Sequence, residues 1–209
     1  MTVRLAAAWI ACASLWGPAE AAAGDWTFRA LLDGKPIGQH RFTVSGQGDE
    51  RTVTSRADFA VRFLGFTAYK YTHTAVERWR GDCLTALAAR TNDDGKSIEV
   101  RAEQSGDGLD VLAGTAPGPL KGCVMTFAYW NPAIRTQSRL LDPQTGRVEA
   151  VQVSRVGAGS IDVRGVPTPA TQFRITGPAS AILVWYSTQG EWLGLDSIVG
   201  GKHKLSYRL

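Results

Sequence analysis

Three histidines, His40, His73 and His203, are the side chains of this sequence with the widest range of chemistry. Histidine binds metals and acts as a general acid or base near neutral pH. Each of the three lies on the more apolar or aromatic face of an alternating segment, and a curled sheet would bring distant residues together. None of them, however, has a second metal ligand at close spacing. We interpret them as separate, hydrogen-bonded histidines of a sheet and expect no metal and no cofactor.

The common motifs of nucleophilic and nucleotide chemistry are missing from the sequence. Ser160 follows Gly157-Ala158-Gly159, which is not the Gly-x-Ser-x-Gly turn of a serine hydrolase, and no helical segment follows it. The chain also has no phosphate-binding loop, no His-Glu-x-x-His and no Cys-x-x-Cys. We therefore assign no catalytic residues and expect a protein that is not an enzyme. If catalytic groups were dispersed along the chain, His73 and Glu77, on one face of one strand, would be the pair to substitute first.

Aromatic side chains from four strand regions give the positive signal. Tyrosine and tryptophan combine a large apolar body with one polar end, which suits the wall or rim of a ligand cavity. If the sheet curls, these side chains would line an apolar cavity for a lipid or another hydrophobic ligand. The alternative is an ordinary β core that the same aromatics fill. The residues predicted to line the cavity are Tyr69, Tyr71, His73, Trp79, Phe127, Tyr129, Trp130 and Trp185.

Alternating segments joined by turn residues must position these side chains. Asp33-Gly34 separates two alternating runs, a strong hairpin signal, and similar glycine-containing turns recur along the chain. Residues 69–79 alternate with a period of two, which is typical of a strand. One short helix is expected over 133–141. The sequence predicts an all-β protein, an antiparallel meander curled into a half-open barrel or a sandwich, with at most one or two short helices.

The N-terminal residues have the layout of a secretory signal peptide. Arg4 precedes an apolar core, and this core is shorter than a membrane-spanning helix, which needs about 20 residues. The small residues that follow place the cleavage near Ala22 or Gly24. We predict a signal peptide over residues 1–23, a single β-rich domain over 24–209, and a periplasmic or secreted protein that does not span the membrane.

Three cysteines become two if the signal peptide is removed. Cys12 lies within the apolar core, and Trp9 stands where a lipoprotein signal would have a leucine-like residue. Cys83 and Cys123 remain, and an even pair in an exported chain favours a disulfide. The alternative is two buried free thiols.

The net charge of +4 comes from charges of both signs that are interspersed along the chain. No cluster of Lys and Arg resembles a stripe that binds nucleic acid, so nucleic acid is not an expected partner. The sequence does not specify an oligomeric state.

Three segments resemble a known family. They are Trp26-x-Phe28-x-x-x-Leu32-Asp33-Gly34-x-x-Ile37-Gly38, then Thr126-Phe127-Ala128-Tyr129-Trp130-Asn131-Pro132, and finally Tyr207-Arg208-Leu209. Together they are similar to a group of exported, β-rich proteobacterial proteins that is classified only as a domain of unknown function. The meander resembles, more distantly, the half-open β-barrels of periplasmic lipid and lipoprotein carriers. The resemblance implies an exported β-rich fold and supplies no catalytic residues.

These observations lead to two hypotheses. The first is a periplasmic, non-enzymatic protein that binds or carries a hydrophobic, lipid-like molecule of the cell envelope. The alternative is a structural or interaction protein of the envelope, with a filled core and no small-molecule ligand.

Overall fold

The computed structural model describes residues 24–63, 66–113 and 118–209. The predicted signal peptide, residues 1–23, and Cys12 lie outside the described residues. Most of the described part is β-strand, and most of the strands form one antiparallel sheet, which confirms the predicted fold class.

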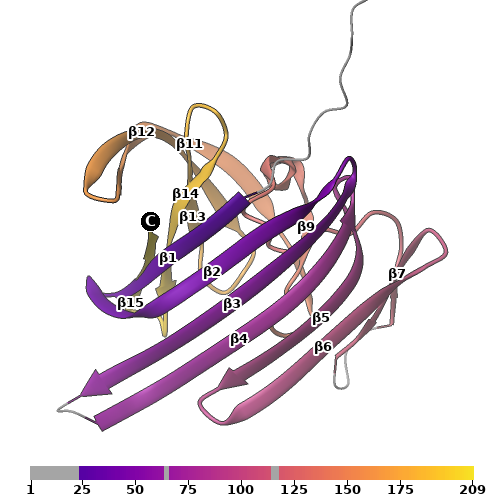
Figure 1. The fold of residues 1–209 in the computed structure, drawn as a ribbon, viewed down its shortest axis with the longest axis horizontal. Coiled ribbons are helices and arrows are strands. Elements are labelled where there is room, and N and C mark those ends of the chain that lie inside the picture. Colours follow the sequence, from indigo (N-terminus) through magenta and orange to yellow (C-terminus); the bar gives the residue numbers. More distant parts are fainter. Residues whose placement is uncertain (1–23, 64–65, 114–117) are drawn as a thin grey trace, which may run out of the picture.

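Thirteen strands of the described part form one sheet, in the order β11-β12-β13-β14-β15-β1-β2-β3-β4-β5-β6-β7-β8. Within the described residues the sheet does not close into a barrel, and its two edges are β11 and β8. Figure 1 shows β1 to β6 side by side across the front, with the later strands curling away behind them. The strands are β1 Gly24–Leu32, β2 Lys35–Gln47, β3 Glu50–Phe63, β4 Phe66–Arg80, β5 Cys83–Asp93, β6 Lys96–Ser105, β7 Gly108–Leu112, β8 Pro119–Leu120, β11 Gln152–Val163, β12 Val166–Thr176, β13 Ile182–Tyr186, β14 Trp192–Val199 and β15 His203–Arg208.

Two-residue turns fix the register of the hairpins. At the β1–β2 turn Asp33 and Gly34 have φ of 49° and 78°, and at the β5–β6 turn Asp94 and Gly95 have φ of 49° and 92°. Positive φ at both central residues is the requirement of a type I′ turn, whose twist matches that of the flanking strands. The Asp-Gly pattern therefore predicted the first hairpin correctly, for a local physical reason.

The last strand lies beside the first, in the middle of the sheet. β15 pairs with both β14 and β1, with Ala30 opposite Tyr207. The pairing is extended at one end, where the Asp33 carboxylate accepts a hydrogen bond from the Lys204 backbone N–H at 2.8 Å. As a result, Tyr207 reaches the inner face of the sheet and packs near Phe28 of β1 and His40 of β2.

The hairpin of β11 and β12 curls around the far half of the sheet. β11 is one continuous strand with a bulge between Arg155 and Gly157. Gly159 lies so close to the Trp185 ring that an added Cβ would stand 3.2 Å from it. This contact belongs to a second small core, formed by Ile161, Ala170 and Leu193, with Val163, Trp185 and Leu209 packed against it.

Residues 121–150, named here the inner segment, lie outside the sheet and pack on its inner face. The segment contains η1 (Pro132–Thr136), β9 (Arg139–Leu141) and β10 (Val148–Ala150). The helix expected over 133–141 is thus one 3₁₀ turn followed by a short strand. The apolar run 123–130, placed in a strand region from the sequence, forms tight turns instead, in which the N–H of Ala128 donates to Thr126 O at 2.7 Å.

A disulfide joins Cys83 to Cys123 and ties the inner segment to the start of β5, which confirms the predicted pair. The adjacent Leu84 N–H donates to Val124 O at 2.8 Å. The inner segment is thus joined to β5 by both a disulfide and a backbone hydrogen bond. A bridge that closes a loop of this length stabilises the folded state by about 3–4 kcal/mol in the chain-entropy model. The inner segment is therefore held against the sheet. Among the described residues, no helix is long and apolar enough to cross a bilayer.

Candidate functional site

A cavity of about 490 Å³ lies between the inner face of the sheet and the inner segment. Its floor follows from the register of β2 to β4, in which Phe42 faces Ser55 and Ser55 faces Ala75. Side chains directly opposite each other on a sheet fill the space above it. Two neighbouring small residues therefore leave a hollow, which the packing of the inner segment does not fill.

The walls are mainly apolar and come from three parts of the chain. The sheet contributes residues on both sides of the floor, the inner segment forms the roof, and the turns at the ends of β13 and β14 form the rim. The lining residues are His40, Phe42, Val53, Ser55, His73, Ala75, Glu77, Thr126, Phe127, Ala128, Tyr129, Trp130, Asp142, Pro143, Gln144, Glu149, Pro178, Ala179, Ser180, Ile182, Ser197, Ile198, Val199 and Gly200.

A chain of hydrogen bonds fixes the orientation of Ser55. The His40 ring bonds Tyr207 OH through Nδ1 at 3.1 Å and Ser55 Oγ through Nε2 at 2.7 Å. Tyr207 is buried, and His40 is the one hydrogen-bond partner of its hydroxyl among the described residues. Because a buried O–H must donate, Tyr207 donates to Nδ1, and the neutral ring then carries its proton on Nε2 and donates to Ser55. The hydroxyl hydrogen of Ser55 is therefore available for donation to a group in the cavity.

A second chain fixes the proton of His73. Its Nδ1 lies 2.9 Å from Thr91 Oγ1, and the same hydroxyl lies 3.5 Å from the carbonyl oxygen of Gln144. A carbonyl only accepts, so the hydroxyl of Thr91 donates to Gln144 and accepts from Nδ1–H of His73. The Nε2 of His73 is then an acceptor at the cavity.

Burial keeps both histidines uncharged. It lowers the pKa of His40 to about 3, with a smaller contribution from the charge of His73, and it lowers the pKa of His73 to about 4. The two rings stand 6.5 Å apart between centroids, on either side of Ala57 of β3. Near neutral pH the histidine end of the cavity floor is therefore polar without being charged.

Glu77 is a buried carboxyl at the other end of the floor, on the same face of β4 as His73 and Ala75. Burial raises its pKa to about 7, while hydrogen bonds from Thr126 and Trp79 oppose the rise. The Trp79 indole N–H donates to Oε2 at 3.0 Å. Both partners are neutral, so desolvation of the charged form is not compensated by a cation.

Four of the eight residues predicted from the sequence line this cavity: His73, Phe127, Tyr129 and Trp130. The other four do not. Tyr71 stacks on Phe59 at 5.4 Å between centroids, and Trp79 is buried edge-on against Trp130. These two support the walls from behind.

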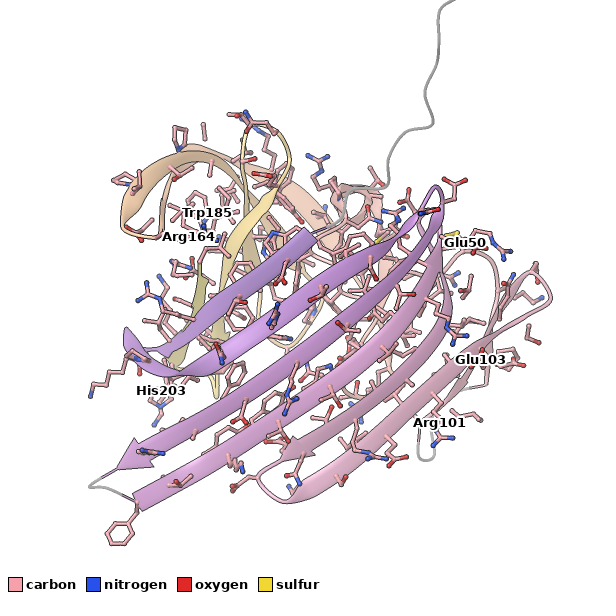
Figure 2. All side chains as sticks on the ribbon, viewed as in Figure 1. Glu50, Arg101, Glu103, Arg164, Trp185 and His203 are labelled. Atoms are coloured by element: carbon pink, nitrogen blue, oxygen red, sulfur yellow. A yellow bond between two sulfur atoms is a disulfide. The ribbon has the colours of Figure 1, made fainter. Side chains whose placement is uncertain are left out.

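Tyr69 and Trp185 lie away from the cavity. The Tyr69 hydroxyl donates to Asp93 at 2.6 Å, beside the β5–β6 turn. Figure 2 shows Trp185 at the curled β11–β12 hairpin, where its indole N–H donates to Asp196 at 3.2 Å.

Sequence reasoning missed Ser55 and Thr126 as cavity residues and weighed Glu77 only as half of a catalytic pair. The signal for Glu77 was the column His73, Ala75, Glu77 and Trp79, where charged and small residues share a face with aromatics. Nothing in the local sequence marked Ser55, because its place depends on the pairing of β2, β3 and β4.

The third histidine is separate from this site. His203 Nδ1 pairs with the Asp33 carboxylate at 2.6 Å on an exposed turn, and this contact lowers the pKa of Asp33. Among the described residues no group of three or more His, Cys, Asp or Glu is placed to hold a metal ion.

Comparison with known proteins identifies the family. The family model described as a domain of unknown function (DUF6134) matches residues 28–209, and the chain belongs to this family. Among solved structures, the fold is similar to a β-barrel-like protein of the domain of unknown function DUF1849 from Brucella abortus. The TM-score is 0.62 at 12% identity, and the match covers 88% of this chain and 93% of that one. At this identity the likeness concerns the fold alone. No curated protein matches the chain.

Proposed function

We propose that this member of the DUF6134 family is an exported, non-enzymatic protein that binds or carries a hydrophobic molecule of the cell envelope. The ligand occupies the cavity between β2–β4 and the inner segment. The single observation that carries the proposal is the hollow above Ser55 and Ala75, which is walled by apolar side chains and a few convergent polar groups. Its volume of about 490 Å³ is in the range of small-molecule sites.

The rim of the cavity suits the passage of a hydrophobic ligand. Ile198 and Val199 line the cavity and are 42% and 37% exposed. Large apolar side chains exposed at the mouth of a pocket are typical of surfaces that bind apolar partners. A ligand that enters there would displace water from its own apolar surface and from the rim. This burial of apolar surface supplies the main driving force for binding.

The polarity of the Ser55–His40 pair supports binding rather than catalysis. A serine and a histidine in contact are also the pair that many hydrolases use, with the histidine as base. Here His40 donates to Ser55, and the low pKa of His40, about 3, opposes the imidazolium that a base must form.

The disulfide supports export. A bond between Cys83 and Cys123 persists in an oxidising compartment, such as the periplasm or the cell exterior. A cytoplasmic location would keep both thiols reduced.

A fluorescence titration with N-phenyl-1-naphthylamine, a neutral apolar probe, tests the proposal. Ala75→Phe fills the hollow from the floor, and Val76→Phe adds the same side chain on the outer face, where Val76 is 47% exposed. We expect the wild type and Val76→Phe to bind the probe alike and Ala75→Phe to bind at least about tenfold more weakly, a change of about 1.4 kcal/mol.

Circular dichroism and thermal unfolding show whether each variant is folded. If Ala75→Phe does not fold, Ser55→Leu takes its place as the filling variant, because it narrows the same floor. A wild type that does not bind the probe, or folded filling variants that bind it as tightly as the wild type does, would overturn the proposal and favour an envelope interaction protein with a filled core.

A further inference from the structure

The floor of the cavity presents one hydrogen-bond donor and one acceptor, and both polarities are fixed from behind. Ser55 donates because His40 already donates to its oxygen, and Tyr207 fixes the proton of His40. His73 accepts through Nε2 because its Nδ1–H is used by Thr91. Neither group can reverse its role without leaving a buried hydrogen or lone pair unpaired.

The donor and the acceptor are neighbours on the sheet but separate points. Ser55 lies opposite Ala75, and His73 lies two residues from Ala75 on the same face of β4. Such diagonal neighbours stand about 7–8 Å apart along the backbone, within reach of one small polar group placed between their side chains. A ligand that satisfies both therefore needs an acceptor atom and a donor atom side by side.

The charges around the cavity exclude an anionic end group, and the Ser55 donor disfavours a cationic one. None of the described residues that line it is Lys or Arg, whereas Glu77, Asp142 and Glu149 do line it. A carboxylate or phosphate would meet no counter-charge there and would face these acidic groups. An ammonium group would leave the Ser55 hydrogen without an acceptor.

We infer that the cavity selects hydrophobic molecules that end in an uncharged amide, whose carbonyl oxygen accepts from Ser55 and whose N–H donates to His73. This inference rests on the proposed function, because it names the ligand class of the same cavity. Esters offer only the acceptor, and hydrocarbons offer neither group. The apolar chain lies under the inner segment, and the amide lies on the polar part of the floor.

Displacement of N-phenyl-1-naphthylamine by four molecules with one shared chain tests the inference: dodecanamide, methyl dodecanoate, dodecanoate and dodecylammonium. In the wild type we expect dodecanamide to bind about tenfold more tightly than methyl dodecanoate, the effect of one net hydrogen bond of about 1.4 kcal/mol. Ser55→Ala should reduce the affinity for dodecanamide several-fold more than the affinity for the probe, which has no carbonyl oxygen to accept from Ser55. The control is Thr54→Ala, next along β3 and exposed on the outer face.

The ¹⁵N chemical shifts of the two imidazoles supply a readout that does not depend on binding. They should show the proton of His40 on Nε2 and that of His73 on Nδ1. The opposite tautomer at His73 in the wild-type protein would overturn the inference by itself.

Different results would overturn the proposed function and the amide inference. If no apolar probe binds, the proposed function is wrong. If the probe binds but the amide has no advantage over the ester, or if dodecanoate or dodecylammonium binds more tightly than the amide, the proposed function stands and the amide inference is wrong.

Discussion

Asp196 on β14, beside the curled β11–β12 hairpin, and Glu77 on β4, at the cavity, are both buried carboxyl groups. Their surroundings shift their pKa values in opposite directions. Burial by itself would raise the pKa of Asp196, but hydrogen bonds from Ser206 and Arg208 outweigh it, so that the pKa is lowered. The distances are 2.7 Å to Ser206 Oγ and 2.6 Å to Arg208 Nη2. Burial raises the pKa of Glu77 to about 7, since only neutral donors contact it.

The two carboxylates differ in whether their surroundings stabilise the charged form. Asp196 links β14 to β15 beneath the curled hairpin, and every partner holds it in the charged form. Glu77 faces a cavity without a cation and changes charge near neutral pH. An arrangement that costs stability and lines a hollow is expected at a binding site rather than in a core.

The largest expected effect comes from Asp196→Asn. This change leaves the half-buried guanidinium of Arg208 without its carboxylate, and breaking such a pair destabilises a protein by about 3–5 kcal/mol. Urea unfolding at pH 7 measures the loss. A loss below about 1 kcal/mol would mean that Asp196 is not the structural carboxylate that the comparison requires.

Glu77→Gln should act in the opposite direction. The folded pKa, about 7, is above the ordinary value of 4.5, so the folded state binds the proton more tightly. The stability that this group contributes is complete below pH 4.5 and is lost as the pH rises through 7. Gln keeps the neutral form, so we expect the variant to exceed the wild type by about 3 kcal/mol at pH 8 and to match it at pH 4.5.

Equilibrium unfolding of both proteins at pH 4.5 and pH 8 measures this difference. Glu103→Gln, on the outer face of β6 (Figure 2), is the matched control and should show no such gain. If the wild type and Glu77→Gln were equally stable at both pH values, burial would not raise the pKa of Glu77.

Ligand binding should be coupled to the same proton. An apolar ligand removes the remaining water near Glu77 and so favours its neutral form. We expect the affinity of the wild type for N-phenyl-1-naphthylamine to fall several-fold from pH 6 to pH 8, and that of Glu77→Gln to stay constant. If the wild type and the variant share one pH profile, the titrating group lies elsewhere.

The smallest expected effect concerns Trp185. Trp185→Phe removes the indole hydrogen bond to Asp196 and should cost about 1 kcal/mol of stability. Its effect on probe affinity should be less than twofold, because Trp185 lies outside the cavity. A loss of binding without a loss of stability would place the ligand beside Trp185, at the β11–β12 hairpin, instead of in the cavity.

The sheet could be predicted from the sequence to the extent that its signals are local. Asp33-Gly34 and Asp94-Gly95 specify type I′ turns, and strict alternation in residues 69–79 specifies which side chains share a face. The disulfide was predicted from the even cysteine count that remains once the predicted signal peptide is removed.

The rest depends on contacts that a sequence does not display. The run 123–130 has the apolar composition of a buried strand, and periodicity does not distinguish a strand from tight turns that pack under a sheet. Gly159 shows no special pattern in the sequence, yet its missing side chain lets β11 pass close over the Trp185 ring. Ser55 acquires its role only through the pairing of three strands and a partner 152 residues away, Tyr207, which acts through His40.

Native mass spectrometry of the protein, purified without detergent, shows directly whether the cavity holds a hydrophobic molecule. We expect the wild type and Val76→Phe to carry an added mass that organic solvent extracts as a hydrophobic molecule, and folded Ala75→Phe to carry none. A wild type that shows only the mass of the polypeptide, both as purified and after incubation with dodecanamide, would contradict the proposed function.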